Sequence, residues 1–374
     1  MKRFASGLAS AVLAVFSAAH AGQVVVAQAV PLTGLDANQG RAYSAGMQLC
    51  FAQTNKAGGV NGNTFTLVRK DDAGKPQETL AVTKQLLAES KPVVLAGYFG
   101  NRNIDDLVAS GILETEKIPL VGYRVSDVRA DAPQLYGVRA GLREEINKFA
   151  EHVAMIGTSR LGLVYEESPN APALLAAANE AATANKASVV AKATYAAGTS
   201  KVGPAVSAML ASNAQAILIV GSGSTVAGFI EQYRGGGGTA QLFAQSAADI
   251  EQLSKRLGEE QMQGVSIAQV TPSPYQLRTR LAKELSDAVA ATGSAGVGVP
   301  VSFTMMEGFI ACKVIVEAAR RQGPKVTREG MTSALDSISG LDLGGYVIGY
   351  KPGMRSGSRL VELSIISASG KIRQ

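Results

Sequence analysis

The chain has 374 residues, 46% of them hydrophobic, which is enough material for two domains with separate cores. Its formal net charge of +6 comes from Lys and Arg residues that are dispersed and not interleaved with aromatic residues, which argues against nucleic acid binding. Two histidines and two cysteines leave little material for a histidine-based metal site or for Ser-His-Asp catalysis. We therefore expect no metal, no cofactor and no enzymatic activity.

The first 21 residues have the pattern of a secretory signal peptide. Lys2 and Arg3 precede an apolar run from Leu8 to about Ala18, which is well short of the about 20 residues that a membrane-spanning helix needs. Ala19-His20-Ala21 then supplies the small residues that a signal peptidase accepts, so cleavage is expected before Gly22. These features predict an exported, soluble mature chain.

Short β-branched runs alternate with helical patterns through the first part of the mature chain. Strands are predicted at Gln23–Val30, Thr64–Val68, Pro92–Ala96 and Ile118–Gly122. Helices are predicted at Ala37–Lys56, Gln77–Glu89 and Ile104–Glu116. Consecutive βαβ units close into a parallel sheet with helices on both faces.

A second cycle of the same kind follows. Its strands are predicted at Leu161–Tyr165, Ser188–Ala193, Gln215–Val220 and Ala240–Ala244. Its helices are predicted at Glu144–Ile156, Ala173–Asn185, Val202–Ser212 and Thr225–Tyr233. An extended stretch, a long helix and a C-terminal hairpin complete the chain at Val265–Val270, Glu307–Arg321 and Leu360–Ile366. The fold class is therefore α/β, with two lobes facing each other across a cleft.

Ligands of open parallel sheets bind outside the carboxyl ends of the strands. The segments that leave these ends are Pro31–Asp36, Gly97–Asn103 and Gly122–Asp127 in the first lobe, and Glu166–Asn170, Gly221–Thr225 and Gln245–Asp249 in the second. Two of them, Gly97–Asn103 and Gly221–Thr225, lead into helix N-termini, whose free N–H groups attract anions. Asn101, Ser222 and Ser224 can add donors there, although ordinary helix capping explains such residues equally well.

Arginine and aromatic residues gather at two exits of the first lobe. The guanidinium of Arg124 has the planar fork that suits a carboxylate, although an ion pair with Asp105, Asp106 or Asp127 explains it equally well. Arg102 is expected to form such a surface ion pair with a neighbouring aspartate. Tyr98, Phe99 and Tyr123 can form an apolar wall beside a ligand, although core packing is an alternative for Phe99.

The two cysteines, Cys50 and Cys312, each lie within a helical pattern. An exported protein permits a disulfide, but their presumed core positions favour two buried free thiols. His152, the histidine left after signal cleavage, lies in a predicted amphipathic helix, where a surface or packing role is expected.

Several motifs resemble those of periplasmic binding proteins of the branched-chain amino acid type. They are Pro31-Leu32-Thr33-Gly34, Asn55-Lys56-Ala57-Gly58-Gly59-Val60-Asn61-Gly62, Asp71-Asp72-Ala73-Gly74-Lys75-Pro76 and Lys117-Ile118-Pro119-Leu120. The similarity covers essentially the whole mature chain in order and spacing. It implies the type I periplasmic-binding fold, with two Rossmann-like lobes of parallel sheet, three crossing strands and closure about a hinge.

The resemblance also implies how the chain divides between the lobes. We expect residues 22–140 and 271–343 in the first lobe, and residues 141–270 and 344–374 in the second. The crossings are then expected near Val138–Leu142, Val265–Val270 and Leu343–Tyr346.

The cleft departs from the family's pattern at several positions. Gly97 is followed by Tyr98 where the family has proline, and Asn101 stands at the position of a serine that grips the ligand carboxylate. At the next exit Ser126 alone keeps a hydroxyl. In the second lobe the family has tyrosines near Asn170 and Gly223, and near Ser246 it has an acid that neutralises the ligand's ammonium group. An uncharged serine offers no such compensation, although Asp249 could substitute.

The resemblance implies a ligand-binding protein of the periplasm that delivers a small ligand to an ABC permease in the inner membrane and acts as a monomer. The altered cleft favours a carboxylate-bearing ligand without an obligatory ammonium group, either an amino acid or an organic or aromatic acid. A sensor that presents its closed form to a signalling partner is the alternative, because both functions use the same closure.

Overall fold

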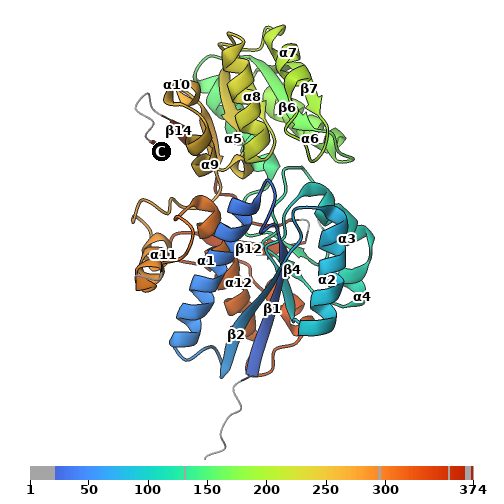
Figure 1. Ribbon diagram of the computed structural model, residues 1–374, viewed down its shortest axis with the longest axis vertical. Helices are drawn as coiled ribbons and strands as arrows, with labels where there is room; N and C mark the ends of the chain where they lie inside the picture. Colours follow the sequence, from blue (N-terminus) through green and yellow to red (C-terminus); the bar gives the residue numbers. More distant parts are fainter. Residues whose placement is uncertain (1–21, 130–131, 294–295, 353, 367–371, 374) are drawn as a thin grey trace, which may run out of the picture.

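A computed structural model describes residues 22–129, 132–293, 296–352, 354–366 and 372–373. The predicted signal peptide lies outside the described residues. Two α/β lobes are stacked end to end in the structure (Figure 1). None of the described helices is both long and apolar enough to cross a membrane.

The first lobe is built on a five-stranded parallel sheet with the strand order β2-β1-β3-β4-β5. Its strands are β1 (Gly22–Val30), β2 (Asn63–Asp71), β3 (Val94–Ala96), β4 (Leu120–Val121) and β5 (Leu135–Tyr136). Its helices are α1 (Ala37–Lys56), α2 (Pro76–Ser90), α3 (Asn101–Ala109), α4 (Ile112–Thr115), α11 (Arg280–Ala290), α12 (Phe303–Gln322) and α13 (Arg328–Asp336). The helix predicted over 104–116 is split in two because Gly111 adopts a left-handed φ of 67°.

The alternating apolar residues of β1 bury both faces of this sheet. Val24 and Val26 point into a core that also contains residues of α1 and α12. Ala27 and Ala29 point to the opposite face, where residues of α2 and α3 cover them. The period of two along a strand therefore places one helix layer on each side, as the sequence predicts.

Helices α1 and α12 approach each other closely because each has a glycine at the contact. A Cβ atom on Gly46 would lie 2.0 Å from the carbonyl oxygen of Met305, and one on Gly308 would lie 2.0 Å from that of Tyr43. A disulfide joins the same two helices through Cys50 and Cys312, whose Cα atoms are 6.1 Å apart. The prediction of two free thiols is therefore wrong, because sequence periodicity buries both cysteines without showing that they face each other.

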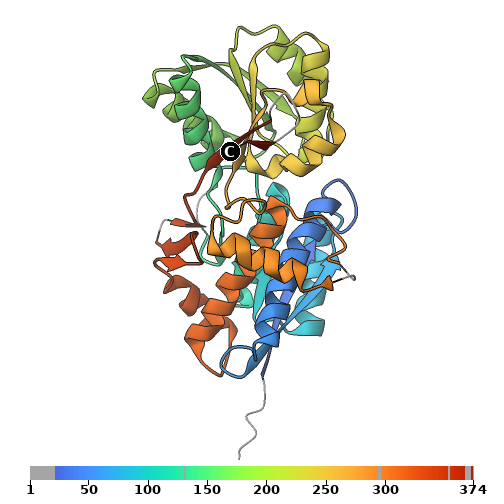
Figure 2. The same cartoon turned by 90° about the vertical axis from the view of Figure 1, so that its left-hand side faces the viewer.

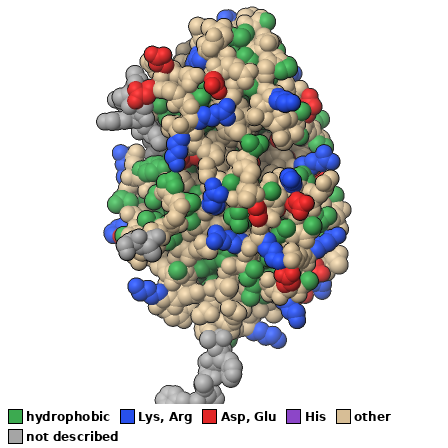
Figure 3. Space-filling view, in the orientation of Figure 1, with side chains coloured by type: hydrophobic (Ala, Val, Ile, Leu, Met, Phe, Trp, Pro, Cys, Tyr) green, Lys and Arg blue, Asp and Glu red, His purple; other side chains and the backbone are tan. Residues whose placement is uncertain are grey.

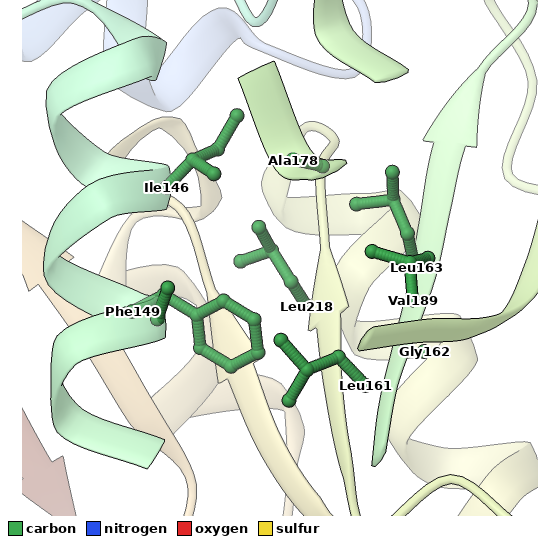
Figure 4. A pocket seen from close by; sticks show the side chains of 9 residues that line it. Ile146, Phe149, Leu161, Gly162, Leu163, Ala178, Val189 and Leu218 are labelled. Atoms are coloured by element: carbon green, nitrogen blue, oxygen red, sulfur yellow. The ribbon is translucent and has the colours of Figure 1, made fainter. Parts of the chain in front are cut away.

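The second lobe has a seven-stranded sheet with the order β15-β14-β10-β9-β8-β6-β7. Its strands are β6 (Arg160–Glu166), β7 (Ser188–Tyr195), β8 (Ala216–Ile219), β9 (Gln241–Ala244), β10 (Ser266–Gln269), β14 (Glu362–Ile366) and β15 (Ile372–Arg373), of which β14 and β15 are antiparallel to their neighbours. Its helices are α5 (Leu142–Met155), α6 (Ala171–Ala184), α7 (Gly203–Leu210), α8 (Gly223–Gly235), the 3-10 turn η1 (Ser246–Ala248), α9 (Ile250–Arg256) and α10 (Glu259–Met262). An apolar pocket lies inside this lobe between α5, α6 and the sheet (Figure 4). Because aliphatic and aromatic core residues line it, we regard it as a packing defect.

Three connections join the lobes (Figure 2). They follow β5 at residues 137–141, β10 at residues 270–279, and β13 at residues 358–361. A small antiparallel sheet of β11 (Leu341–Asp342), β12 (Val347–Lys351) and β13 (Met354–Gly357) packs on the first lobe, with Ile348 and Tyr350 in its core. The chain thus returns to the second lobe after Gly357, later than the crossing expected at Leu343–Tyr346.

Tyr346 shows why this segment stays with the first lobe. Its buried hydroxyl lies 2.8 Å from the carbonyl oxygen of Val138 and 2.9 Å from that of Val270. Since these carbonyls belong to the starts of the first two connections, the single O–H of Tyr346 can donate to either of them at the hinge.

Candidate functional site

The carboxyl ends of the two sheets face each other, and side chains from the exits link the lobes directly. Asn101 Nδ2 donates to Glu166 Oε2 (3.2 Å), Gln245 Nε2 donates to Ser126 Oγ (2.9 Å), and Gln39 Nε2 donates to the carbonyl oxygen of Ala247 (3.2 Å). The structure therefore has the lobes in direct contact at their strand exits, and this contact region is called the cleft below.

Arg124 lies at the centre of the first lobe's side of the cleft. Its side chain is 4% exposed, and the guanidinium lies over the ring of Phe99, 5.4 Å from the centroid. Nη1 donates to Gln39 Oε1 (2.8 Å) and to Thr304 Oγ1 (2.9 Å). No described residue accepts a hydrogen bond from Nη2.

A buried ion-pair network continues from Arg124 to the hinge. Oε2 of Glu307 on α12 lies 3.3 Å from Arg124 Nε and 3.5 Å from Nη1 of Arg139, which belongs to the first connection. Arg139 Nη2 lies 2.9 Å from Glu145 Oε1 and also donates to Ser246 Oγ. Burial alone would lower the pKa of Arg139, but the two carboxylates beside it raise that pKa. Two arginines and two glutamates thus balance their charges between the lobes.

Ser246 belongs to this network. Its backbone N–H donates to Glu145 Oε2 (2.7 Å) and its hydroxyl donates to Glu145 Oε1 (2.8 Å). The structure therefore places Ser246 against the hinge, where it holds a glutamate in position.

Asn170 takes part in a second link between the lobes. Its Nδ2 donates to Asp127 Oδ2 (2.8 Å) and lies 3.4 Å from Asp105 Oδ2. Arg129 of the first lobe holds the same two carboxylates, with distances of 2.9 Å and 2.8 Å from its Nη2. Asn170 is therefore fixed across the closed cleft by two carboxylates of the opposite lobe.

Other predicted site residues lie outside the cleft's centre. Tyr98 is fully buried beneath α2, with its hydroxyl 3.0 Å from Thr83 Oγ1. Tyr123 packs against the same core cluster. Gly223 packs against α9, since a Cβ there would lie 2.3 Å from Gln252 Oε1. Ser222 precedes α8 with its hydroxyl 3.2 Å from that of Ser224.

Phe99 is 6% exposed and belongs to the core of the first lobe, where it packs against Tyr43, so core packing accounts for it. The expected surface role of Arg102 is observed. Arg102 pairs with Asp106 at 3.8 Å, with its side chain 76% exposed. On the face shown in Figure 3, basic side chains are scattered over both lobes.

Sequence reasoning missed several polar residues of the cleft, namely Gln39, Thr304 and Glu307. Glu307 carries a signal that could have found it, because it is the only acid in the largely apolar helical run Phe303–Val316. An acid on a buried helical stretch requires a cationic partner. Gln39 and Thr304 carry no comparable signal.

Three further carboxyl groups lie at or beside the strand exits. Burial raises the pKa of Asp36 after β1 and of Glu166 at the end of β6. Asp249 at the start of α9 accepts a hydrogen bond from the backbone of Gln252 (3.1 Å), and its Oδ2 lies 3.4 Å from Thr304 Oγ1.

A family model described as "Periplasmic binding protein" matches residues 23–357. Among solved structures, a substrate-binding periplasmic protein from Ralstonia solanacearum is 34% identical with a TM-score of 0.87, and the match covers 93% of this chain and 99% of that one.

Two curated proteins match shorter stretches. An "Amino acid binding protein" of Pseudomonas aeruginosa is 37% identical over 76 residues, which is 20% of each chain. "Leu/Ile/Val-binding protein homolog 2" of Brucella abortus is 32% identical over 78 residues, which is 21% of each chain. The chain thus aligns with about a fifth of the length of these curated relatives.

Proposed function

Since the chain belongs to the periplasmic binding protein family, of the branched-chain amino acid type, we propose that it captures a small carboxylate-bearing ligand between its lobes. The ligand is an amino acid or an organic or aromatic acid. The closed form, acting as a monomer in the periplasm, delivers it to the permease of an ABC importer. The family is one of solute-binding proteins, not of enzymes.

The environment of Arg124 supports this function most directly. Its guanidinium is buried at the carboxyl edge of the first sheet. Gln39 accepts a hydrogen bond from its Nη1 atom and donates one to the carbonyl oxygen of Ala247, in the 3-10 turn of the second lobe. A carboxylate that reaches Nη2 would gain a charge-assisted hydrogen bond in a site of low dielectric. Because Gln39 contacts the second lobe only when the lobes are closed, a ligand that orders Arg124 also favours closure.

We propose that Phe99, Asn101 and Ser126 complete the ligand contacts in the first lobe. Phe99 offers a ring face below Arg124, while Asn101 and Ser126 lie at the line where the lobes meet. Asn101 Oδ1 also accepts the backbone N–H of Ser126 at 2.7 Å, so the two exits are held together. In the second lobe, we propose Asn170 and Ser222 as candidates for ligand contacts.

A thermal-shift panel of amino acids and of aromatic and aliphatic carboxylic acids tests the function, since a ligand that binds only the folded state raises the unfolding temperature. Small-angle scattering with a saturating amount of the strongest compound should then show a smaller radius of gyration than scattering without it. A radius that stays constant at saturation would contradict closure. Uptake of the same labelled compound by cells with and without the gene would separate import from sensing.

A further inference from the structure

Glu251 of α9 makes a further contact between the lobes. Helix α9 lies at the end of the second lobe that is next to the first (Figure 1). Glu251 Oε1 accepts hydrogen bonds from the backbone N–H of Phe303 (2.9 Å), the first residue of α12, and from the hydroxyl of Tyr275 (2.5 Å) in the second connection. One oxygen atom of the second lobe therefore binds both a helix of the first lobe and the chain that crosses between the lobes.

Two aromatic rings cover this contact. The ring of Phe303 is 8% exposed and packs in the core of the second lobe, although the rest of its helix contributes to the core of the first. It also meets the ring of Tyr275 edge to face, with 5.9 Å between the centroids. Parting the lobes at this point would expose Phe303 and hydrate Glu251. The environment of the carboxyl group therefore depends on whether the lobes touch.

The second oxygen of the Glu251 carboxyl group lacks a donor. Its Oε2 is buried, and no described residue donates a hydrogen bond to it. Asp249, two residues earlier, acts on Glu251 through its charge and through hydrogen bonding between the two side chains. Ionised carboxylates only accept hydrogen bonds, so a bond between these two acids requires a proton on one of them. The contact is thus complete when the pair of acids holds one proton.

The other charged groups near this pair do not replace the proton. Asp249 Oδ2 lies 3.4 Å from Thr304 Oγ1, which accepts a hydrogen bond from Arg124 Nη1 (2.9 Å). Arg124 is already paired with Glu307. Asp36 of the first lobe adds a further negative charge, which Asp249 repels. Protonation of one acid is therefore the means that offsets the second negative charge of the pair.

Opposing effects act on the pKa of Glu251. Burial and the charge of Asp249 raise it, whereas the hydrogen bonds from Tyr275 and Phe303 lower it, and the result is a pKa of about 8 in place of 4.5. With the lobes apart, the hydrated carboxyl group returns toward its ordinary pKa. Between these two values, joining the lobes takes up a proton. The ratio of joined to separated lobes then falls by up to about tenfold for each unit by which pH rises.

We propose that Glu251 is a proton-controlled latch between the lobes. It holds α9 against the first turn of α12 when the pair of Glu251 and Asp249 carries a proton, and it releases α12 when both acids are ionised. This inference goes beyond the proposed function, because the latch acts on the lobes themselves and needs no ligand. It makes the balance between joined and separated lobes, and with it access to the cleft, depend on pH near neutrality.

Small-angle scattering of the protein without added compounds tests the latch. We expect the wild type to have a larger radius of gyration at pH 8.5 than at pH 5.5, while circular dichroism shows that it stays folded at both. Glu251→Gln keeps the acceptor oxygen and supplies an N–H group to Asp249, so its radius should stay small at both pH values. Glu231→Gln, which changes an exposed glutamate on α8, is the matched control and should expand as the wild type does.

Asp249→Asn distinguishes a pair of acids from a role of Glu251 alone. Its side-chain oxygen can still accept the hydrogen bond from the backbone of Gln252 that Asp249 accepts at the start of α9. Its amide nitrogen can donate to the ionised Glu251, so this variant too should stay compact at pH 8.5. Expansion equal to that of the wild type would overturn the role of the pair.

The amide resonance of Phe303 reports on the contact directly. In protein labelled with ¹⁵N-phenylalanine, this resonance is assigned by its loss in Phe303→Leu. It should titrate with a midpoint near pH 8 in the wild type and show no such step in Glu251→Gln. A midpoint near 4.5 would overturn the latch, as would equal wild-type radii at the two pH values or an expansion of Glu251→Gln as large as that of the wild type. Each of these results leaves the proposed function to the thermal-shift panel, which tests it separately.

Discussion

Glu307 and Arg124 form an ion pair between α12 and the exit of β4, with 3.3 Å between Oε2 and Nε and with neither side chain more than 4% exposed. Since Glu307 also serves Arg139, Glu307→Gln leaves two buried guanidinium groups with a single remaining carboxylate. We expect this change to lower the free energy of unfolding by about 3–5 kcal/mol, measured by urea denaturation.

Glu317→Gln is the control on the same helix. Glu317 pairs with Arg320 and Arg321 at the surface, where such pairs contribute about 0–1 kcal/mol. Similar losses for the two variants would show that burial of the Glu307 pair has no special importance.

Replacing Arg124 should weaken ligand binding as well. Arg124→Ala removes the proposed carboxylate contact and the Gln39 link, and we expect the compound selected by the thermal-shift panel to bind at least ~30-fold more weakly. Arg102→Ala, one strand exit away, should change its Kd less than twofold because Arg102 is largely exposed. Calorimetric titration of the two variants measures both Kd values. An unchanged Kd in Arg124→Ala would show that Arg124 does not contact the ligand.

The sequence predicts the elements of the fold well, because periodicity is a local property. Helix α1 has the predicted ends, and most strands of both sheets lie within a few residues of their expected positions. The third crossing is misplaced, since nothing local to Leu343–Tyr346 shows that the hydroxyl of Tyr346 reaches Val138 and Val270. Long-range contacts of this kind decide lobe membership.

In the cleft, too, local features are predictable and long-range contacts are not. Its strand exits are predictable because carboxyl ends of parallel strands share an edge. The direction of each side chain at an exit depends on the twist of the last residues, so adjacent residues differ: Tyr98 is buried in the core cluster of α2 and α3, whereas Phe99 is buried in the core cluster of α1 and α12 with Arg124 over its ring. The contributions of Gln39 and Glu307 come from helices whose packing sequence periodicity does not determine.

The disulfide between Cys50 and Cys312 connects segments 262 residues apart and ties α12 to α1. Thiol titration of the denatured, unreduced protein should therefore detect no free thiol. Replacing both cysteines by alanine should lower the free energy of unfolding by about 2–5 kcal/mol, because the cross-link restricts the unfolded chain. Two thiols per chain in protein purified from the periplasm would show that the bond does not form there.

Glu251 makes stability depend on pH near neutrality. On α9 of the second lobe, its Oε1 accepts hydrogen bonds from the Tyr275 hydroxyl (2.5 Å) and from the backbone N–H of Phe303 (2.9 Å) at the edge of the first lobe. Burial, reinforced by the negative charge of Asp249, raises the pKa of Glu251 from 4.5 to about 8. The carboxyl group is therefore largely protonated in the folded protein at pH 7.

The sign of the effect follows from proton binding. Between pH 4.5 and about 8 the folded state holds a proton on Glu251 that the unfolded state releases, so the free energy of unfolding falls as pH rises through this window. Glu251→Gln imitates the protonated group, because its amide oxygen still accepts both hydrogen bonds and its amide nitrogen can donate to Asp249. Urea denaturation at pH 5, 6.5 and 8 should show that the free energy of unfolding of the wild type declines with pH. The decline should be smaller in Glu251→Gln, by at least ~1 kcal/mol at pH 8. Glu231→Gln, which changes an exposed glutamate on α8, should follow the wild-type decline. If the free energy of unfolding of Glu251→Gln falls with pH as steeply as that of the wild type, the group that titrates is a residue other than Glu251.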